Sequence, residues 1–599
     1  MREHPNPSGG DLRLSVHGHI EVKMKLPFSH FALLLAAFVM VPSGVSFADA
    51  AVSPGVPSPV QVQTEPAAPL PFGTQLSLHP GAYTLLAARQ SVELRAFPLS
   101  QTERVDLSLD RFEVFAENAQ LVEMTADGPV ALSRPELALF HGVVAGEPGS
   151  SVFLSFAPER VDGVITRAGR SFVVSSGPAG QTLPPVVYDL AEVPEEFIAS
   201  GFECAIDQIP QPLVRLADAQ RKGAANRGDA PCRRADVAVE TDVEYRQLLG
   251  GSAPATAYIG TLLGAVSEIY ERDVNTRLQV VYSRIWSGAP GTDPWNQGDT
   301  VNQLYQFQDY WNANMTNISR HVAHFLSGRG LGGGVAYLPG LCQDEYDYGL
   351  SANLNGFFPY PIQNNSAQNW DLMVTAHELG HNFGAPHTHD LSPPVDGCAW
   401  GDCSVAPNGT IMSYCHLCSG GLANVRMEFH QRNIDENMLP YLANDAPCNT
   451  ELTPLSIIDQ PDSAAVCAGE DVFMTVTVSG SGPISYQWRK NTVNIPGANT
   501  NVYYVFDVGP SNVGNYDVVC AGPCGSVTSD AAVISLASSY AGDLDGDCDV
   551  DLADLSGLLS SYGLCEGAPA YNPAADLDGD GCVGLADLSE LLQDFGAGA

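Results

Sequence analysis

The stretch that decides the fold of the central chain is His377-Glu378-Leu379-Gly380-His381-Asn382-Phe383-Gly384-Ala385-Pro386-His387. It follows an apolar segment, 370–376, that predicts the start of a helix. Four residues make slightly more than one helical turn, so His377 and His381 share one helical face, where two imidazoles can bind one ion. Gly384 can adopt the left-handed conformation that ends a helix, and His387 then returns as a third nitrogen ligand.

This histidine pattern predicts a catalytic zinc site. Three neutral nitrogens leave the fourth tetrahedral position to water, which distinguishes a catalytic zinc from a structural one. Zinc lowers the pKa of water, and Glu378, which neighbours His377, is expected to act as the general base. Beyond the motif, the segment Thr410–Tyr414 predicts a tight turn that places Met412 beneath the metal as an apolar floor. A chance string on a core helix would not require this second element.

The extended histidine motif and the Met turn resemble those of the metzincin clan of zinc endopeptidases. The sequence HELGHNFGAPH is most similar to the reprolysin (adamalysin/ADAM) branch of this clan. The resemblance covers 231–450 and implies an α/β domain with a mixed five-stranded sheet, three main helices, a cleft and peptide-bond hydrolysis. The segment Gly334–Tyr337 resembles the edge strand that pairs with substrate backbone. Tyr414 falls near the S1′ wall of the family. A calcium ion in this domain is a further implication, near Asp236, Cys448 and Asn449.

The first 50 residues have the layout of a secretory signal peptide. Lys23 and Lys25 precede an apolar run, 31–41, and small residues at 46, 48 and 50 offer cleavage sites. Eleven apolar residues are too few to span a bilayer. We therefore expect a secreted or cell-surface protein, with no membrane span in its mature form and with disulfide bonds.

Residues 51–230 read as a β-rich region with linkers, because short alternating segments are punctuated by Gly and Pro. In the reprolysin branch a prodomain precedes the catalytic domain, and 140–146 with 151–155 resemble its body, so the resemblance implies that this region is a prodomain. The segment 215–234 holds six of the 28 basic residues, and we expect it to be an exposed processing site. Cys204 has two alternative roles. Its thiolate would fill the fourth zinc position and keep the protease latent as a zymogen, or it would form a disulfide, for example with Cys232.

Residues 452–538 resemble an immunoglobulin-like sandwich. A Trp at 488 and a Tyr at 516 stand where such a fold places them, but Val518 occupies the usual second cysteine position. We therefore expect no inter-sheet disulfide, and Cys467 is expected to pair with Cys524 or Cys520.

Residues 541–599 contain a repeat at a 33-residue offset. Each copy places carboxylates at calcium-loop spacing and is followed by a leucine-rich amphipathic helix, so the pair resembles a type I dockerin. The resemblance implies a cohesin-like or cell-surface partner. The first loop has Cys548 where Gly is preferred. The expected calcium ligands are Asp543, Asp545, Asp547, Asp549, Asp554, Asp576, Asp578, Asp580 and Asp587.

Composition narrows the function classes. The 599-residue chain has 28 basic and 68 acidic residues, a net charge of −40, which disfavours nucleic-acid binding. Thirteen of the acidic residues lie in 541–599, where bound Ca²⁺ would offset part of the charge.

We therefore expect a multidomain, secreted, zymogenic zinc endopeptidase that acts on proteins or peptides, with C-terminal modules for attachment. One alternative is a non-catalytic binding or scaffold protein on a metzincin fold, with the dockerin-like tail as its main functional element. Another is a protease that cuts only its own linker while docking dominates. The presence of all three ligands and Glu378 favours the first hypothesis.

Overall fold

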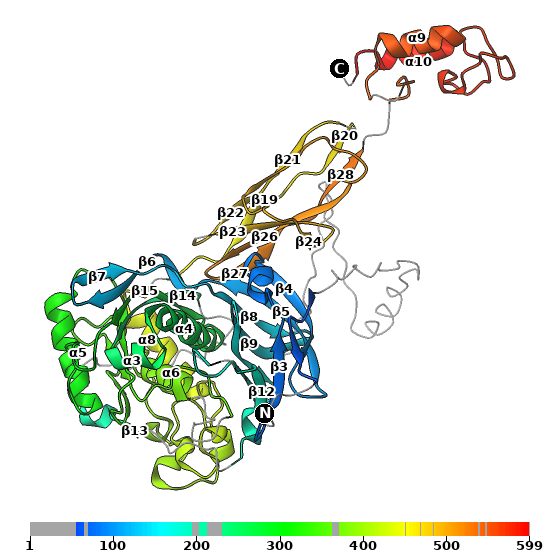
Figure 1. Ribbon diagram of the computed structural model, residues 1–599. Helices are drawn as coiled ribbons and strands as arrows, with labels where there is room; N and C mark the ends of the chain where they lie inside the picture. Colours follow the sequence, from blue (N-terminus) through cyan, green and yellow to red (C-terminus); the bar gives the residue numbers. More distant parts are fainter. Residues whose placement is uncertain are drawn as a thin grey trace, which may run out of the picture. The chain divides into compact units, whose positions relative to one another are not determined.

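The computed structural model describes residues 56–64, 70–181, 183–194, 203–211, 231–361, 370–449, 451–467, 469–482, 484–536, 540–545 and 548–597. All of these lie within 53–599, and Figure 1 shows the helices and strands that they form. The signal-peptide prediction, 1–50, and most of the predicted processing segment lie outside the described residues. Among the described residues, no helix has the length and apolar character needed to cross a bilayer.

The N-terminal β region, residues 56–194, is built around a ten-stranded sheet. On strand β9, Val152, Leu154 and Phe156 point into the core of this region, whereas Phe153 points to the opposite face. Both faces of the sheet are therefore covered. Across the sheet the order is β1 (Val56–Pro57), β4 (Ser91–Pro98), β5 (Arg104–Phe112), β8 (Ala138–Val144), β9 (Glu147–Ala157), β10 (Arg160–Arg167), β11 (Arg170–Ser175), β12 (Val186–Asp189), β3 (Thr74–Leu78) and β2 (Val60–Val62).

A second sheet of eight strands carries the central domain. Five of its strands come from 231–450, as expected, and β17 runs antiparallel to β18 while the other pairs among these five are parallel. Three further strands come from earlier in the chain, so the sheet extends beyond the predicted five strands. Its order is β13 (Glu203–Cys204), β17 (Gly333–Ala336), β18 (Tyr348–Ser351), β16 (Val322–Leu326), β14 (Arg233–Thr241), β15 (Thr276–Trp286), β6 (Phe115–Thr125) and β7 (Gly128–Ala131).

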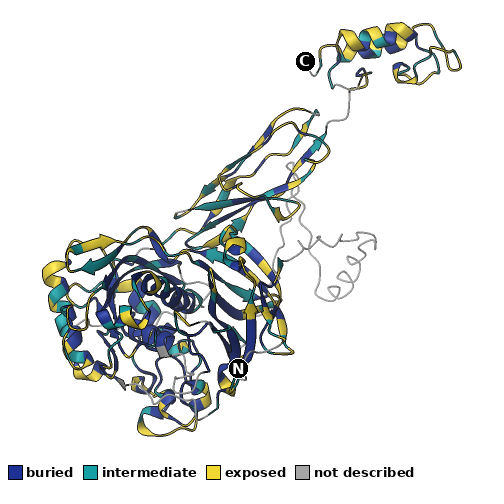
Figure 2. Ribbon diagram, in the orientation of Figure 1, coloured by how far each residue is buried: buried dark blue, intermediate teal, exposed yellow. Residues whose placement is uncertain are grey.

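Three long helices cover the two faces of this sheet. On β14, Val237 and Val239 pack into the core that contains α4 (Ser252–Val274) and α6 (Trp370–Asn382), whereas Ala238 packs into the core on the α5 side (Thr300–Asn314). Figure 2 shows α4 buried along its length. The short helices are α2 (Ala82–Ala87), α3 (Val243–Leu248), α7 (Gln431–Asn433) and α8 (Leu439–Asn444).

The C-terminal strand region, residues 451–536, has a core centred on the fully buried Trp488. The indole N–H of Trp488 donates to Thr500 O at 2.8 Å, and Tyr516 OH donates back to Asn512 O at 2.7 Å. Its strands are β19 (Ser456–Asp459), β20 (Ala464–Val466), β21 (Val472–Thr475), β22 (Thr477–Ser479), β23 (Ser485–Lys490), β24 (Val493–Asn494), β25 (Val502–Val505), β26 (Gly514–Gly522), β27 (Gly525–Thr528) and β28 (Ala532–Leu536).

The repeat region, residues 540–597, contains two loops, each followed by a helix, α9 (Leu552–Ser561) and α10 (Leu585–Asp594). The two copies use the same hydrogen bonds. Asp554 accepts from Leu544 N at 2.6 Å, and its counterpart Asp587 accepts from Leu577 N at 2.8 Å. The sequence repeat is therefore a structural repeat.

Twelve of the 14 cysteines form disulfides. The prediction for Cys467 is wrong: it pairs with Cys548, because Cys520 is buried in its own core and Cys524 is bonded to Cys232. The alternative disulfide between Cys204 and Cys232 is therefore not formed. The remaining pairs are Cys342–Cys448, Cys398–Cys415, Cys403–Cys418 and Cys565–Cys582.

Candidate metal centre

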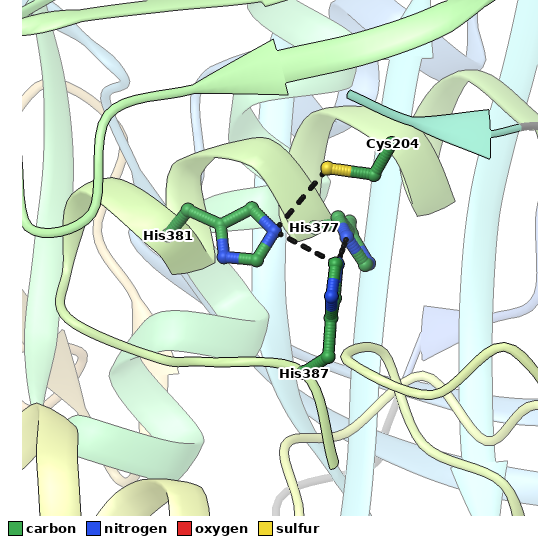
Figure 3. Close-up of side chains that lie close together, drawn as sticks. All are labelled: Cys204, His377, His381 and His387. Atoms are coloured by element: carbon green, nitrogen blue, oxygen red, sulfur yellow. Dashed lines mark hydrogen bonds between the residues drawn. The ribbon is translucent and has the colours of Figure 1, made fainter. Parts of the chain in front are cut away.

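Helix α6 presents two of the three predicted ligands. His377 and His381 lie one turn apart with ring centroids 4.8 Å from each other, and both are fully buried. The helix ends at Asn382, and Gly384 follows with a φ of +89°, a left-handed conformation that costs glycine little. The chain then turns back and brings His387 to the same point (Figure 3).

The three imidazoles converge through their Nε2 atoms. His387 Nε2 lies 3.3 Å from His377 Nε2 and 3.2 Å from His381 Nε2. Three nitrogens at zinc-ligand distance from one tetrahedral ion sit about 3.3 Å from each other. The spacing therefore fits one shared zinc ion.

Backbone carbonyls beside Nδ1 fix the orientation of two of the three rings. A ring N–H that donates from Nδ1 leaves the lone pair on Nε2, which is the tautomer that a metal requires. Burial and the neighbouring imidazole of His387 lower the pKa values of His377 and His381, so their neutral form is favoured. The Nδ1 partners are Ile411 O at 2.7 Å for His377 and Ala385 O at 2.8 Å for His381. Nδ1 of His387 makes no hydrogen bond among the described residues, and the Asp390 carboxylate lies 3.4 Å from it.

The thiol of Cys204 lies at the fourth corner of this group. Its Sγ is 3.4 Å from His381 Nε2, and the four donor atoms all lie within 4.8 Å of one another (Figure 3). Cys204 is a free, buried cysteine. Burial, then the carboxylate of Glu378, raises its thiol pKa, so a thiolate at this place would need a cation beside it.

Glu378 lies next to the ligands without belonging to the ring of nitrogens. The thiol of Cys204 donates to Glu378 Oε2 across 3.6 Å, whereas Oε1 is buried and has no hydrogen-bond partner among the described residues. Burial raises the pKa of this carboxyl well above its ordinary value. A Cβ atom on Gly334 of β17 would overlap the Glu378 carboxylate, so the absence of a side chain at this position leaves room for the carboxylate.

The predicted Met turn packs against α6 between the ligands. Met412 is fully buried, and a Cβ atom placed on Gly380 would lie 2.7 Å from its sulfur. Met412 O accepts from Thr388 N at 3.0 Å, which ties the turn to the segment that follows His387. The turn and the third ligand are thus fixed to each other.

Tyr414 packs beside the third predicted ligand and the Cys204 backbone. Its ring centroid is 4.7 Å from that of His387, and its hydroxyl donates to Cys204 O at 3.2 Å. The role in the S1′ wall stays a prediction. His389 stacks on His387 with a centroid distance of 5.0 Å and lies outside the group of four donor atoms.

The segment around Cys204 lies along the edge strand β17. Cys204 pairs with Gly334 in parallel register, and Ala205 N donates to Gly334 O at 3.0 Å. Farther along, Leu338 N donates to the side-chain oxygen of Gln211 at 2.7 Å. Residues 203–211 thus occupy the edge that the sequence analysis associated with substrate.

Sequence reasoning missed two residues of this site. Gly334 was named only as part of an edge strand, and nothing in the sequence showed that Glu378 would approach it. Asp390 was not named, although a carboxylate three residues beyond a ligand is close enough to hold a ring nitrogen.

The predicted calcium ligands gather in the repeat region. Carboxylate oxygens of Asp543, Asp545 and Asp554 lie within 4.8 Å of one another. In the second loop, Asp576 accepts from Gly581 N at 2.9 Å, the position that Cys548 occupies in the first loop. Asp547 lies outside the described residues. Binding of calcium by these loops stays a prediction.

The calcium ion of the central domain stays a prediction, since the named residues have several partners while both side-chain amide atoms of Asn449 are buried without a hydrogen bond among the described residues. Cys448 is bonded to Cys342, and Asn449 O accepts from the guanidinium of Arg233 at 2.9 Å. A carboxylate oxygen of Asp236 lies 2.8 Å from Arg234 Nε.

Comparison with known proteins points to one family for the central domain. Residues 232–424 match the model of the family described as Metallo-peptidase family M12 (Reprolysin_5). Two relatives from Gloydius brevicauda, the zinc metalloproteinase-disintegrin-like proteins brevilysin H2a and H2b, are each 28% identical over 156 residues. The match covers 25% of this chain and 33% of each relative, so the chain spans about a third of the length of these relatives.

Solved structures match a smaller part of the chain. Tandem Ig repeats of Dlar cover 14% of this chain at 19% identity, and the match covers 48% of that chain with a TM-score of 0.13. A score this low carries no argument about the fold. The family model and the two relatives support a reprolysin-type metalloprotease domain of family M12 over residues 232–424, and this family implies zinc.

Proposed function

We propose that the protein is a secreted, latent zinc endopeptidase. The observation that carries the proposal is the convergence of three imidazole nitrogens, a thiol and a buried carboxylate at one point beside an edge strand. His377, His381 and His387 would hold the ion. When bound, zinc supplies Lewis acidity, which acidifies water and polarises a peptide carbonyl.

Glu378 is the general base in this proposal. Its raised pKa suits a group that takes a proton from the attacking water and returns it to the leaving amine. The substrate would pair with β17, whose backbone groups give affinity without requiring a particular side-chain sequence. Gly334 keeps the Glu378 carboxylate beside this strand.

Cys204 keeps the enzyme latent in this proposal. Its thiolate would occupy the fourth ligand position, and strand β13 occupies the edge of β17 that a substrate would need. A strand edge accepts one partner at a time, so the segment 203–211 and a substrate exclude each other. Tyr414, which donates to Cys204 O, adds a further contact to the latent state.

Export and processing complete the proposal. The signal-like first 50 residues support secretion, and the basic segment 215–234 supports cleavage between Cys204 and the protease domain. The immunoglobulin-like and dockerin-like C-terminal regions would attach the enzyme to a cohesin-like or cell-surface partner. Leu552 and Leu585, at the same place in the two repeats, are 71% and 72% exposed and are available for such a contact.

The test of the catalytic proposal is zinc analysis of the purified protein together with cleavage of an unfolded protein after processing. We expect one zinc per chain, loss of activity with a chelator, and loss of activity in Glu378→Ala with zinc retained. Equal cleavage by the wild type and Glu378→Ala would contradict the mechanism. A zinc-loaded protein that cleaves nothing would favour the scaffold alternative, and cleavage of its own linker alone would favour the docking alternative.

The latency proposal has a separate test. We expect Cys204→Ala to cleave a short peptide without prior processing, because the fourth ligand is lost. Cys520→Ala is the matched control, since Cys520 is the other free, buried cysteine among the described residues and lies in the C-terminal strand region. Uncut Cys204→Ala with no more activity than the uncut wild type would contradict latency by this thiol.

A further inference from the structure

Strand β6 belongs to the N-terminal β region in sequence, but in space it belongs to the eight-stranded sheet of the central domain. It pairs in parallel with β15, from Phe115 opposite Val280 to Met124 opposite Trp286. Figure 1 shows β6 and β7 continuing the sheet beyond β15. If β6 left, β15 would become an edge with a row of unpaired backbone groups.

Helix α4 is enclosed by the same region. Eighteen of its 23 residues are buried, and a helix that is buried all round must be covered on more than one side. One side packs on the catalytic sheet. The other carries Gly260 and Gly264, where an added Cβ atom would lie 2.7 Å from the Leu137 side chain and 2.9 Å from the Phe153 ring, respectively. Because the two glycines have no side chains, side chains of the N-terminal β region reach the backbone of α4 on this face.

Polar groups of the two parts are also matched across this contact. Ser151 Oγ donates to Glu268 at 2.8 Å, and the hydroxyls of Ser155 and Thr261 lie 2.9 Å apart. All four residues are buried. Separation would expose these groups to water together with the apolar face of α4. Two more bonds of this kind are Tyr188 OH to Pro359 O at 3.1 Å and Tyr360 OH to Pro184 O at 2.7 Å.

The segment 203–211, which lies along β17, has fewer contacts with the central domain than the N-terminal β region has. It forms two strand pairs, at Glu203 and Cys204, hydrogen bonds at Ala205 and Gln211, and the contacts of Cys204 with Glu378, His381 and Tyr414, and none of these partners belongs to β6 or α4. Its larger buried apolar side chains are Ile206 and Ile209. It can therefore leave the cleft without disturbing β6 or α4.

We propose that residues 56–194 are a permanent subunit of the mature protease and not a prodomain that is discarded. After the chain is cut between 212 and 230, this subunit stays bound through β6 and the Gly260–Gly264 face of α4, and activation requires only that 203–211 leave the cleft. This inference rests on the proposed function, because cleavage of the chain activates the protein only if it is a latent protease.

The experiment uses the full chain carrying Glu378→Ala, which cannot cut itself under the proposed mechanism. A recognition sequence for an unrelated endoprotease is placed between 212 and 230, and the protein is cut there. We expect the two fragments to co-elute as a 1:1 complex in size-exclusion chromatography, with both masses present in one peak. Elution of a folded C-terminal fragment alone would overturn the proposal.

Hydrogen exchange gives a second readout that does not depend on elution. The amides of β15 should be equally protected before and after the cut, and a loss of protection confined to β15 and α4 would overturn the proposal. Gly264→Leu should raise the dissociation constant of the cut complex at least tenfold, because its side chain meets the Phe153 ring. Gly298→Leu is the matched control, since a Cβ atom there meets no atom within 4 Å.

The failure of this proposal is distinguishable from the failure of the proposed function. The co-elution experiment uses an inactive variant, so its result is the same whether or not the wild type cleaves proteins. Conversely, a wild type that cleaves substrates while its fragments separate would support the protease and refute the permanent subunit.

Discussion

Gly334 shows how one missing side chain can set the position of the carboxylate that we propose as the general base. Its backbone belongs to β17 and pairs with Cys204, while the space above its Cα holds the carboxylate of Glu378. Any larger residue would compete with Glu378 for this space. A general base acts only within hydrogen-bond reach of the water it deprotonates, so its position controls the rate.

We therefore predict that Gly334→Ala lowers kcat by about 10- to 100-fold, since a misplacement of about 1 Å can cost this much. The measurement is cleavage of a short peptide by the processed enzyme, with zinc content and thermal unfolding recorded beside it. Gly330→Ala is the control, because its nearest neighbour would be Asn353 Nδ2 at 4.0 Å. Unchanged kcat in Gly334→Ala, or an equal loss in Gly330→Ala, would contradict this reading.

Asp390 carries the second residue-scale prediction. Its carboxylate lies 3.4 Å from His387 Nδ1, which makes no hydrogen bond among the described residues, whereas backbone carbonyls that mutation cannot remove bind Nδ1 of the other two histidines. Asp390→Ala should weaken zinc binding about 10- to 100-fold, the usual cost of losing such a partner. Asp390→Asn should recover most of the affinity. Competition with a chelator measures the effect, and equal affinity of Asp390→Ala and the wild type would show that the contact is dispensable.

At the scale of elements, the central helix and the returning His387 could be predicted because their signals are local. Helical spacing places His377 and His381 on one face, and Gly384 ends the helix within the motif itself. The neighbours of the site could not be predicted in this way. Strand β13 is two residues long and has no alternation to recognise, and its place on β17 depends on backbone pairing that any sequence can make.

The strand pattern of the N-terminal β region has the same limit. Alternation at 152–156 predicts a strand, and the structure has one with both faces covered, which the alternation did not predict. The pattern of β6 does not say which sheet it joins, and the family resemblance and the position before the protease domain assigned all of 51–230 to one prodomain. Disulfide partners could not be predicted from local pattern either, because Cys467 pairs with a residue 81 positions away in the next region.

The repeat region carries the element-scale prediction. Asp554 and Asp587 are buried and each closes its own loop through three backbone N–H groups. If the loops bind calcium, Asp587→Ala should remove one ion of two and lower the thermal stability of this region in calcium. Calorimetric titration of the full chain measures the stoichiometry. Asp594→Ala, at the end of α10, should keep both ions, and a wild type that binds none would refute the calcium loops.

At the scale of the whole molecule, charge is unevenly distributed between the parts. The repeat region has acidic residues but no Lys or Arg between 541 and 599. The contact between α4 and the N-terminal β region, in contrast, contains acidic side chains together with a histidine and an arginine. His141 of β8 lies 3.2 Å from Glu268 Oε2 and 3.7 Å from Glu271 Oε2. Arg277 pairs with Glu271 from β15. This buried cluster makes the contact sensitive to protonation.

The pH dependence of the contact follows from His141. Burial opposes its charge, but the hydrogen bond to Glu268 and the carboxylate of Glu271 outweigh burial and the charge of Arg277, so its pKa is raised above the ordinary 6.5. Asp110, on the neighbouring strand β5, also faces it. A histidine whose pKa is raised by assembly strengthens the complex fully below its ordinary pKa, and this contribution is lost as pH rises through the raised value.

We therefore predict that the cut complex dissociates more readily as pH rises from about 6 to 9, a range that begins near the ordinary histidine pKa and extends above it, in the direction of the shift. The dissociation constant of the two fragments, measured across this range in the Glu378→Ala background, should increase with pH. His141→Gln should bind more weakly at pH 6 and show a flatter profile, because the charge that the two carboxylates attract is gone. His79→Gln, at an exposed histidine of the same region, should leave the wild-type profile unchanged. A profile equally steep in His141→Gln would assign the pH dependence to other groups and contradict the role of this cluster.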